Sequence, residues 1–80
     1  MTERVHPSVL DDFDRRMLEF MVLWEPYGGP PRDEIYPRFG LWPDAWFLRV
    51  RQVALHALYL HPSPEDAVLC RYVLNSAVVQ

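Results

Sequence analysis

The segment from Pro31 to Leu58 constrains the fold of this 80-residue chain most, because it reads as two helices joined by a tight turn. Pro-Arg-Asp-Glu opens a short helix, and we expect Gly40 to end it in the left-handed region. Trp-Pro-Asp then opens a longer amphipathic helix. This order of elements predicts a helix-turn-helix unit.

One further helix is predicted on each side of this unit. Apolar side chains recur at helical spacing in the N-terminal part of the chain, where Ser8 is the predicted N-cap. Ser63, followed by proline and two acidic residues, gives the strongest helix start in the sequence. We therefore expect an all-α fold, a four-helix single domain over residues 1–80 with the helix-turn-helix-like unit at its centre. The four predicted helices cover residues 8–24, 31–39, 43–60 and 64–77.

Two positions depart from the usual helix-turn-helix pattern. Tyr36 stands four residues before Gly40, where a small residue is usual, and Arg49 stands nine residues after it, where an apolar residue is usual. Either the turn is one residue longer than standard or the two helices cross differently. Pro37 lacks the amide of a regular helix and costs about 3 kcal/mol in a helix interior, so we expect a kinked or 3₁₀ end to the first helix.

The composition indicates a folded domain that exposes part of its apolar surface. Half of the residues are apolar and 14% are aromatic, which is more apolar surface than one small core buries, so a partner or a second copy is plausible. The net charge is −3 and all eight basic residues are arginine, either because the genome is GC-rich or because arginine pairs bidentately with anions. The acidic balance counts against tight non-specific DNA binding by a monomer, but not against a local basic patch.

The sequence predicts no enzyme, no metal site and no cofactor. The three histidines and Cys70 lack the spacing of metal ligands, and Cys70 reads as a small buried hydrophobe. The aspartates near residue 12 read as a solvated helix start rather than a catalytic pair. We therefore expect no catalytic residue.

A cytoplasmic location is expected. A single cysteine excludes an internal disulfide and favours a reducing compartment. No run approaches the roughly 18 apolar residues of a membrane span, so no membrane contact is expected. The segment Met1–Val5 lacks the apolar core of a signal peptide.

The polar face of the 43–60 helix is the best candidate functional surface. Placed at about 100° per residue, Trp46, Val50 and their neighbours form a core arc, and the opposite arc carries Ala45 with three polar residues. If this helix enters a major groove, Arg49, Gln52 and His56 contact bases. Phosphate contacts are then expected from Arg32, Arg38 and Arg51. The ordinary alternative is a solvated helix face with no function.

A second candidate surface would bind protein. Leu48 and Leu55 form an apolar strip outside the main core face, and this strip needs a cover. Trp42 is either an exposed anchor for a partner or packed against Trp24 or Tyr27. The apolar helix over 64–77, with Leu48 and Leu55, is the candidate contact of a homodimer, and a helix this apolar is expected to be sandwiched.

Apolar and aromatic residues recur along the chain in a characteristic order: Phe13, Met17, Leu18, Glu19, Phe20, Trp24, Ile35, Phe39, Leu41, Trp46, Phe47, Val50, Val53, Pro64, Val68, Leu69 and Arg71. This spacing resembles that of a small, poorly characterised actinobacterial family of short helix-turn-helix proteins, or a phage relative of it. The resemblance implies an all-helical fold and a role in transcription, and it implies no catalytic residue or cofactor. Members of that family tend to be basic near the C-terminus, whereas only Arg71 is basic after Arg51 here, which favours a protein partner.

Two functions follow as hypotheses. The first is a small DNA-binding or transcription-associated protein, active as a dimer, that reads double-stranded DNA with its third helix. The second is an acidic protein-interaction module on the same scaffold, docking on RNA polymerase or another regulator.

Overall fold

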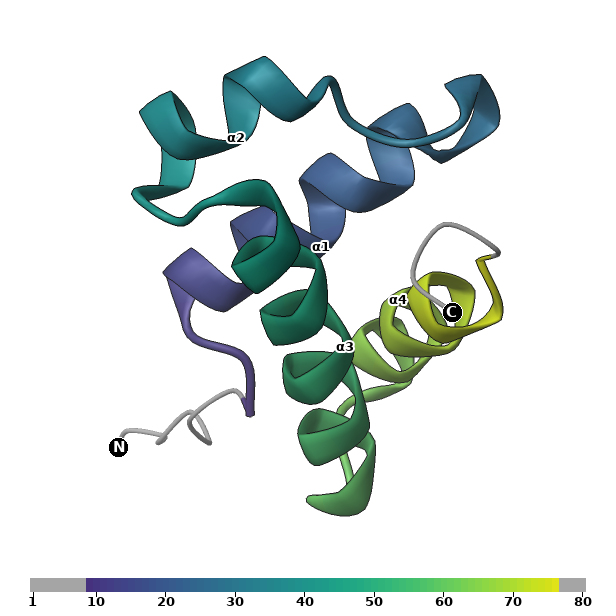
Figure 1. Ribbon diagram of the computed structural model, residues 1–80. Coiled ribbons are helices and arrows are strands. Elements are labelled where there is room, and N and C mark those ends of the chain that lie inside the picture. The colour runs from purple at the N-terminus through teal and green to yellow at the C-terminus, as the bar shows by residue number, and fades with distance from the viewer. Residues whose placement is uncertain (1–8, 77–80) are drawn as a thin grey trace.

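The computed structural model describes residues 9–76, and this part of the chain is all-helical without a strand. Figure 1 shows α2 lying over α1 and α3 running away from the turn after α2, with α4 beside the C-terminal half of α3. Helix α3 packs against α1, α2 and α4, so it is the central element of the fold. The helices are α1 (Asp12–Trp24), α2 (Arg32–Phe39), α3 (Pro43–Tyr59) and α4 (Pro64–Asn75), with a 3₁₀ turn, η1 (Glu25–Tyr27), after α1. The predicted all-α class and four helices are confirmed.

The helix ends follow the capping residues, with one correction. The Ser63 hydroxyl accepts a hydrogen bond from the Asp66 amide at 3.2 Å, as predicted for an N-cap. The predicted start of the first helix near residue 8 is wrong, because residues 9–11 are not helical. Asp11 is the N-cap, and its carboxylate accepts from the Asp14 amide at 2.8 Å. Ser8 itself and the predicted helix end at residue 77 lie outside the described residues.

A glycine with positive φ stands in the connection on each side of α2, and Gly40 was predicted to be one. Pro37 disturbs α2 less than predicted. Gly28 and Gly40 have φ of 91° and 71°, in the left-handed region. The predicted 3₁₀ end of α2 is wrong, because α-helical geometry continues through Pro37 to Phe39, where the Gly40 amide donates to the Tyr36 carbonyl at 2.8 Å. The free energy gained by burying Ile35 helps to offset the cost of the backbone hydrogen bond that Pro37 cannot donate.

The core forms where α1, α2 and α3 meet. Trp46 is fully buried, and its ring lies 5.6 Å from that of Phe39 and 6.1 Å from that of Phe20. The predicted core arc of α3 is confirmed, since Val50, Ala54 and Ala57 are buried with it. Apolar burial of this kind is the main stabilising contribution in a domain of this size.

An ion pair between α1 and α4 adds a polar contact to this apolar packing. The Asp66 carboxylate, only 5% exposed, accepts hydrogen bonds from both terminal nitrogens of Arg15. The pair connects α1 and α4 through two residues that are 51 positions apart in sequence.

Candidate interaction surface

The polar face of α3 lies on the outside of the molecule, as predicted. Arg49, Gln52 and His56 are all exposed. They border a shallow cavity of about 260 Å³ between α3 and the start of α1, which is also lined by Val9, Asp14 and Val53. The three predicted base-reading residues therefore lie together.

Asp14 was missed as a member of this surface. Its Oδ1 atom is buried, accepts no hydrogen bond from the described residues, and lies 3.8 Å from Nη2 of Arg49. Burial raises the pKa of Asp14, the charge of Asp11 raises it further, and Arg49 opposes both. Because the folded pKa of Asp14 is raised, the ionised carboxylate is less favourable in the folded chain than in the unfolded chain. The contact holds Arg49 toward α1.

The middle of the outward face of α3 is apolar rather than basic. Leu48 is 55% exposed and Leu55 is similarly exposed, as the sequence predicted for a strip that needs a cover. Tyr59, one turn after Leu55, extends the strip and is the most exposed of the three. Helix geometry places Leu48, Gln52, Leu55 and Tyr59 opposite the core arc, with Arg49 and His56 toward one side.

Three of the four arginines in and around the helix-turn-helix unit already contact carboxylates. Arg32 pairs with Asp44 at 3.0 Å across the two helices, and Arg38 pairs with Glu34 at 3.2 Å within α2. Both pairs are exposed, so each contributes little to stability. Arg51 is exposed and forms no ion pair with the residues between 9 and 76.

Trp42 lies in the turn and is 67% exposed. It stacks on Tyr36 with 4.2 Å between ring centroids and 24° between planes. The alternative that Trp42 packs against Trp24 or Tyr27 is wrong, because the ring that Trp42 contacts is that of Tyr36. Trp24 and Tyr27 contact each other, with 5.8 Å between ring centroids. Tyr36 faces outward and Ile35 is the buried residue of α2, so the unusual tyrosine does not stand between the helices.

The C-terminal helix is less enclosed than predicted. Cys70 and Val73 are buried against α1 and α3, but Val68 and Tyr72 are exposed, so within the described residues α4 is covered on one side rather than sandwiched. The Tyr72 hydroxyl donates to Glu25 at 3.1 Å, and this hydrogen bond raises the pKa of Tyr72. Burial raises the pKa of the Cys70 thiol, which suits the predicted inert hydrophobe.

Comparison with protein-family models, curated proteins and solved structures returned no match to this chain. Over residues 9–76 no group of metal-ligating side chains gathers. No helix in that part of the chain has the length and apolar character to cross a membrane.

Proposed function

We propose that this protein is a protein-interaction module on a helix-turn-helix scaffold, and that it docks on a larger protein of the transcription apparatus. The stacked pair of Tyr36 and Trp42, called the aromatic pair below, carries the proposal. An exposed tryptophan held in one orientation by a neighbouring ring contributes large contact area with little loss of side-chain entropy on binding. RNA polymerase is the first partner to test.

Charge favours a basic partner surface. The chain carries a net charge of −3. Asp33, one turn before Tyr36 on the same helix, forms no ion pair with the described residues. Asp44, two positions after Trp42, is 92% exposed and pairs with Arg32. A complementary site would be an apolar pocket for Trp42 with lysines or arginines at its rim.

The outward face of α3 supports protein over DNA. A recognition helix places side chains with hydrogen-bonding groups against base edges, whereas Leu48 and Leu55 occupy the centre of this face. Phosphate binding by Arg32, Arg38 or Arg49 requires each to leave a carboxylate of its own chain.

Replacing Trp42 with alanine is expected to weaken binding to purified bacterial RNA polymerase by at least about 30-fold, the effect of losing a central aromatic anchor. Tyr27 is the matched control, because it is also an exposed ring that packs on a neighbouring aromatic residue, but lies in η1. Interferometry with the immobilised protein would give both affinities. Equal affinity of Trp42→Ala and wild type, with the helical content of both unchanged, would reject the proposed anchor.

DNA binding is the second candidate, and the joint exposure of Arg49, Gln52 and His56 on a helix that follows a glycine turn favours it. Arg51, with no carboxylate partner in the described part of the chain, is the best placed of the predicted phosphate contacts. Two copies, with their α3 helices one helical turn of DNA apart, would double the number of phosphate contacts made by the arginines.

If α3 binds DNA, Arg49→Ala should weaken binding of a mixed-sequence 30-base-pair duplex and reduce the salt slope by about one unit. Asp14→Asn should strengthen binding severalfold, because it releases Arg49 and removes a negative charge. Since the pKa of Asp14 is raised, acidification should strengthen binding by wild type more than by Asp14→Asn. Fluorescence anisotropy over a salt series from about 50 mM to about 200 mM, repeated at a lower pH, measures all three effects. An Asp14→Asn variant that binds no tighter than wild type would argue against a DNA-binding α3.

A further inference from the structure

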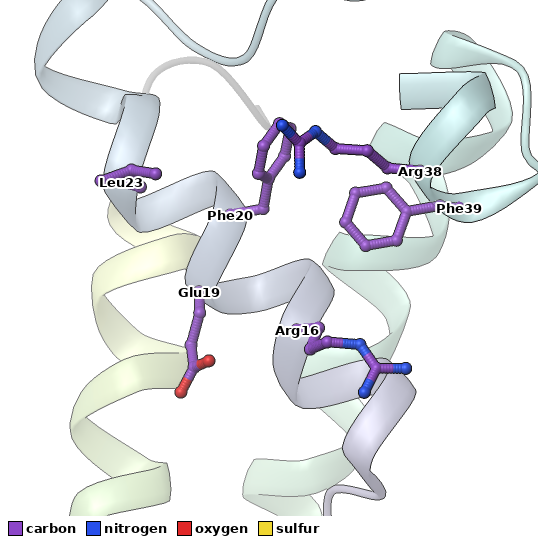
Figure 2. Close-up of a pocket in the computed structure, with 6 residues that line it drawn as sticks. All are labelled: Arg16, Glu19, Phe20, Leu23, Arg38 and Phe39. Atoms are coloured by element: carbon purple, nitrogen blue, oxygen red, sulfur yellow. The ribbon is translucent and has the colours of Figure 1, made fainter. Parts of the chain in front are cut away.

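A cavity lies between α1 and α2. It has a volume of about 510 Å³, within the range of small-molecule sites. Its lining residues are Arg16, Glu19, Phe20 and Leu23 from α1 with Arg38 and Phe39 from α2 (Figure 2). We call it the α1–α2 groove, and we propose that it binds a small aromatic monocarboxylate.

The floor of the groove is aromatic and fixed. The Phe20 and Phe39 rings meet edge to face, with 5.4 Å between centroids and 65° between planes. Phe20 belongs to the buried core, where it contacts Trp46, and Phe39 packs against the same cluster. Because these rings are held by the core, the apolar surface exists before a ligand arrives, which lowers the entropic cost of binding.

Two guanidinium groups from different helices border this floor. The Arg38 guanidinium lies 5.0 Å from the centroid of the Phe20 ring and is oriented by Glu34. Arg16 is exposed and forms no ion pair with residues 9–76. Figure 2 shows the Arg38 guanidinium beside the Phe20 ring and the Glu19 carboxylate directed away from both phenyl rings. Guanidinium groups pair bidentately with carboxylates, and Arg38 already pairs with Glu34, so Arg16 is the group that would bind an anionic head group.

The same lining limits the charge and shape of the ligand. Because Glu34 already pairs with Arg38, one guanidinium, that of Arg16, is left for the ligand, which disfavours a dianion such as a phosphate monoester. The edge-to-face rings favour a flat aromatic body over a sugar. An aromatic monocarboxylate satisfies both limits.

The groove is separate from the proposed docking surface. Arg38 is two positions after Tyr36 on α2, which is about 200° around a helix, so Arg38 and Tyr36 lie on opposite sides of α2, and neither Tyr36 nor Trp42 lines the groove. A ligand that spans α1 and α2 stabilises their packing without covering Trp42. Failure of the docking proposal therefore leaves this one standing, and the reverse also holds.

Titration calorimetry and thermal unfolding with 1-naphthoate test the proposal. We expect a Kd of about 1 mM, the affinity typical of a ligand of this size, and a rise in the unfolding temperature. Arg16→Gln should weaken binding about tenfold, as expected for loss of a charge-assisted contact, whereas Arg51→Gln is the control and should bind as wild type. Neutral 1-naphthamide and ringless acetate should both bind at least several-fold more weakly than 1-naphthoate.

Three results would overturn the proposal. One is equal affinity for the naphthamide and the naphthoate, which would mean that the arginines do not select an anion. Another is equal affinity of Arg16→Gln and Arg51→Gln. The third is unchanged binding by Leu23→Glu, in which an exposed rim leucine becomes a carboxylate that repels the ligand. Because Leu23 and Arg16 are both exposed, neither substitution removes a core contact.

Discussion

Replacing Trp46 with alanine is expected to lower the free energy of unfolding by about 3–5 kcal/mol. The side chain is fully buried, and its ring contacts Phe20, Phe39 and Phe47 with centroid distances of 5.0–6.1 Å. The substitution leaves a cavity where three helices meet. A domain of this size has a total stability near the low end of about 5–15 kcal/mol, so much of the variant should be unfolded at 37 °C.

Trp42 is the matched control, because it is the same residue type four positions earlier. It is 67% exposed and has one stacking partner, so Trp42→Ala should cost only about 1 kcal/mol. Urea unfolding followed by circular dichroism at 222 nm gives both values. Equal losses for the two tryptophans would contradict the buried position of Trp46.

A milder substitution separates packing from hydrogen bonding. The Nε1 atom of Trp46 is buried and donates to none of the described residues. Trp46→Phe removes this unsatisfied donor along with part of the ring, and the two effects oppose each other. Its cost should therefore fall well below that of Trp46→Ala, although both lose the indole.

Helix positions could be predicted from the sequence because they depend on local signals. Periodic apolar residues, Gly40 and Ser63 act within one or two turns of their own position. The start of α1 was misplaced because Ser8 and Asp11 both offer capping side chains with an acidic residue three positions later. Choosing between them depends on how the preceding residues pack, and Leu10, which is buried, is one of them.

The candidate surface was predicted only in part, because its remaining contacts join distant residues. Exposure of Arg49 and its neighbours follows from the helical period. The contact of Arg49 with Asp14 depends on how α1 and α3 cross, which no spacing within either helix encodes. Tyr36, which departs from the helix-turn-helix pattern, stacks on Trp42 at the surface, and the spacing within α2 does not encode this contact either.

Breaking the ion pair between Arg15 and Asp66 is expected to have the second large effect on stability. Arg15→Ala should lower the free energy of unfolding by about 3 kcal/mol, the lower end of the range for breaking a buried pair, because the guanidinium is partly exposed. The largely buried Asp66 carboxylate would then lose both hydrogen bonds from Arg15, and removing one partner of such a pair is costly.

Two further variants test whether the effect of Arg15→Ala depends on the burial of the ion pair. Arg32→Ala breaks a pair whose side chains are 63% and 92% exposed, and it should cost less than about 1 kcal/mol. The double variant Arg15→Met, Asp66→Leu replaces both charges with apolar groups and should recover most of the stability lost in Arg15→Ala, because no buried charge remains. If Arg15→Ala lowers the free energy of unfolding no more than Arg32→Ala does, the α1–α4 ion pair is dispensable for stability. Apolar packing, such as that of Cys70 and Val73, then holds α4 in place.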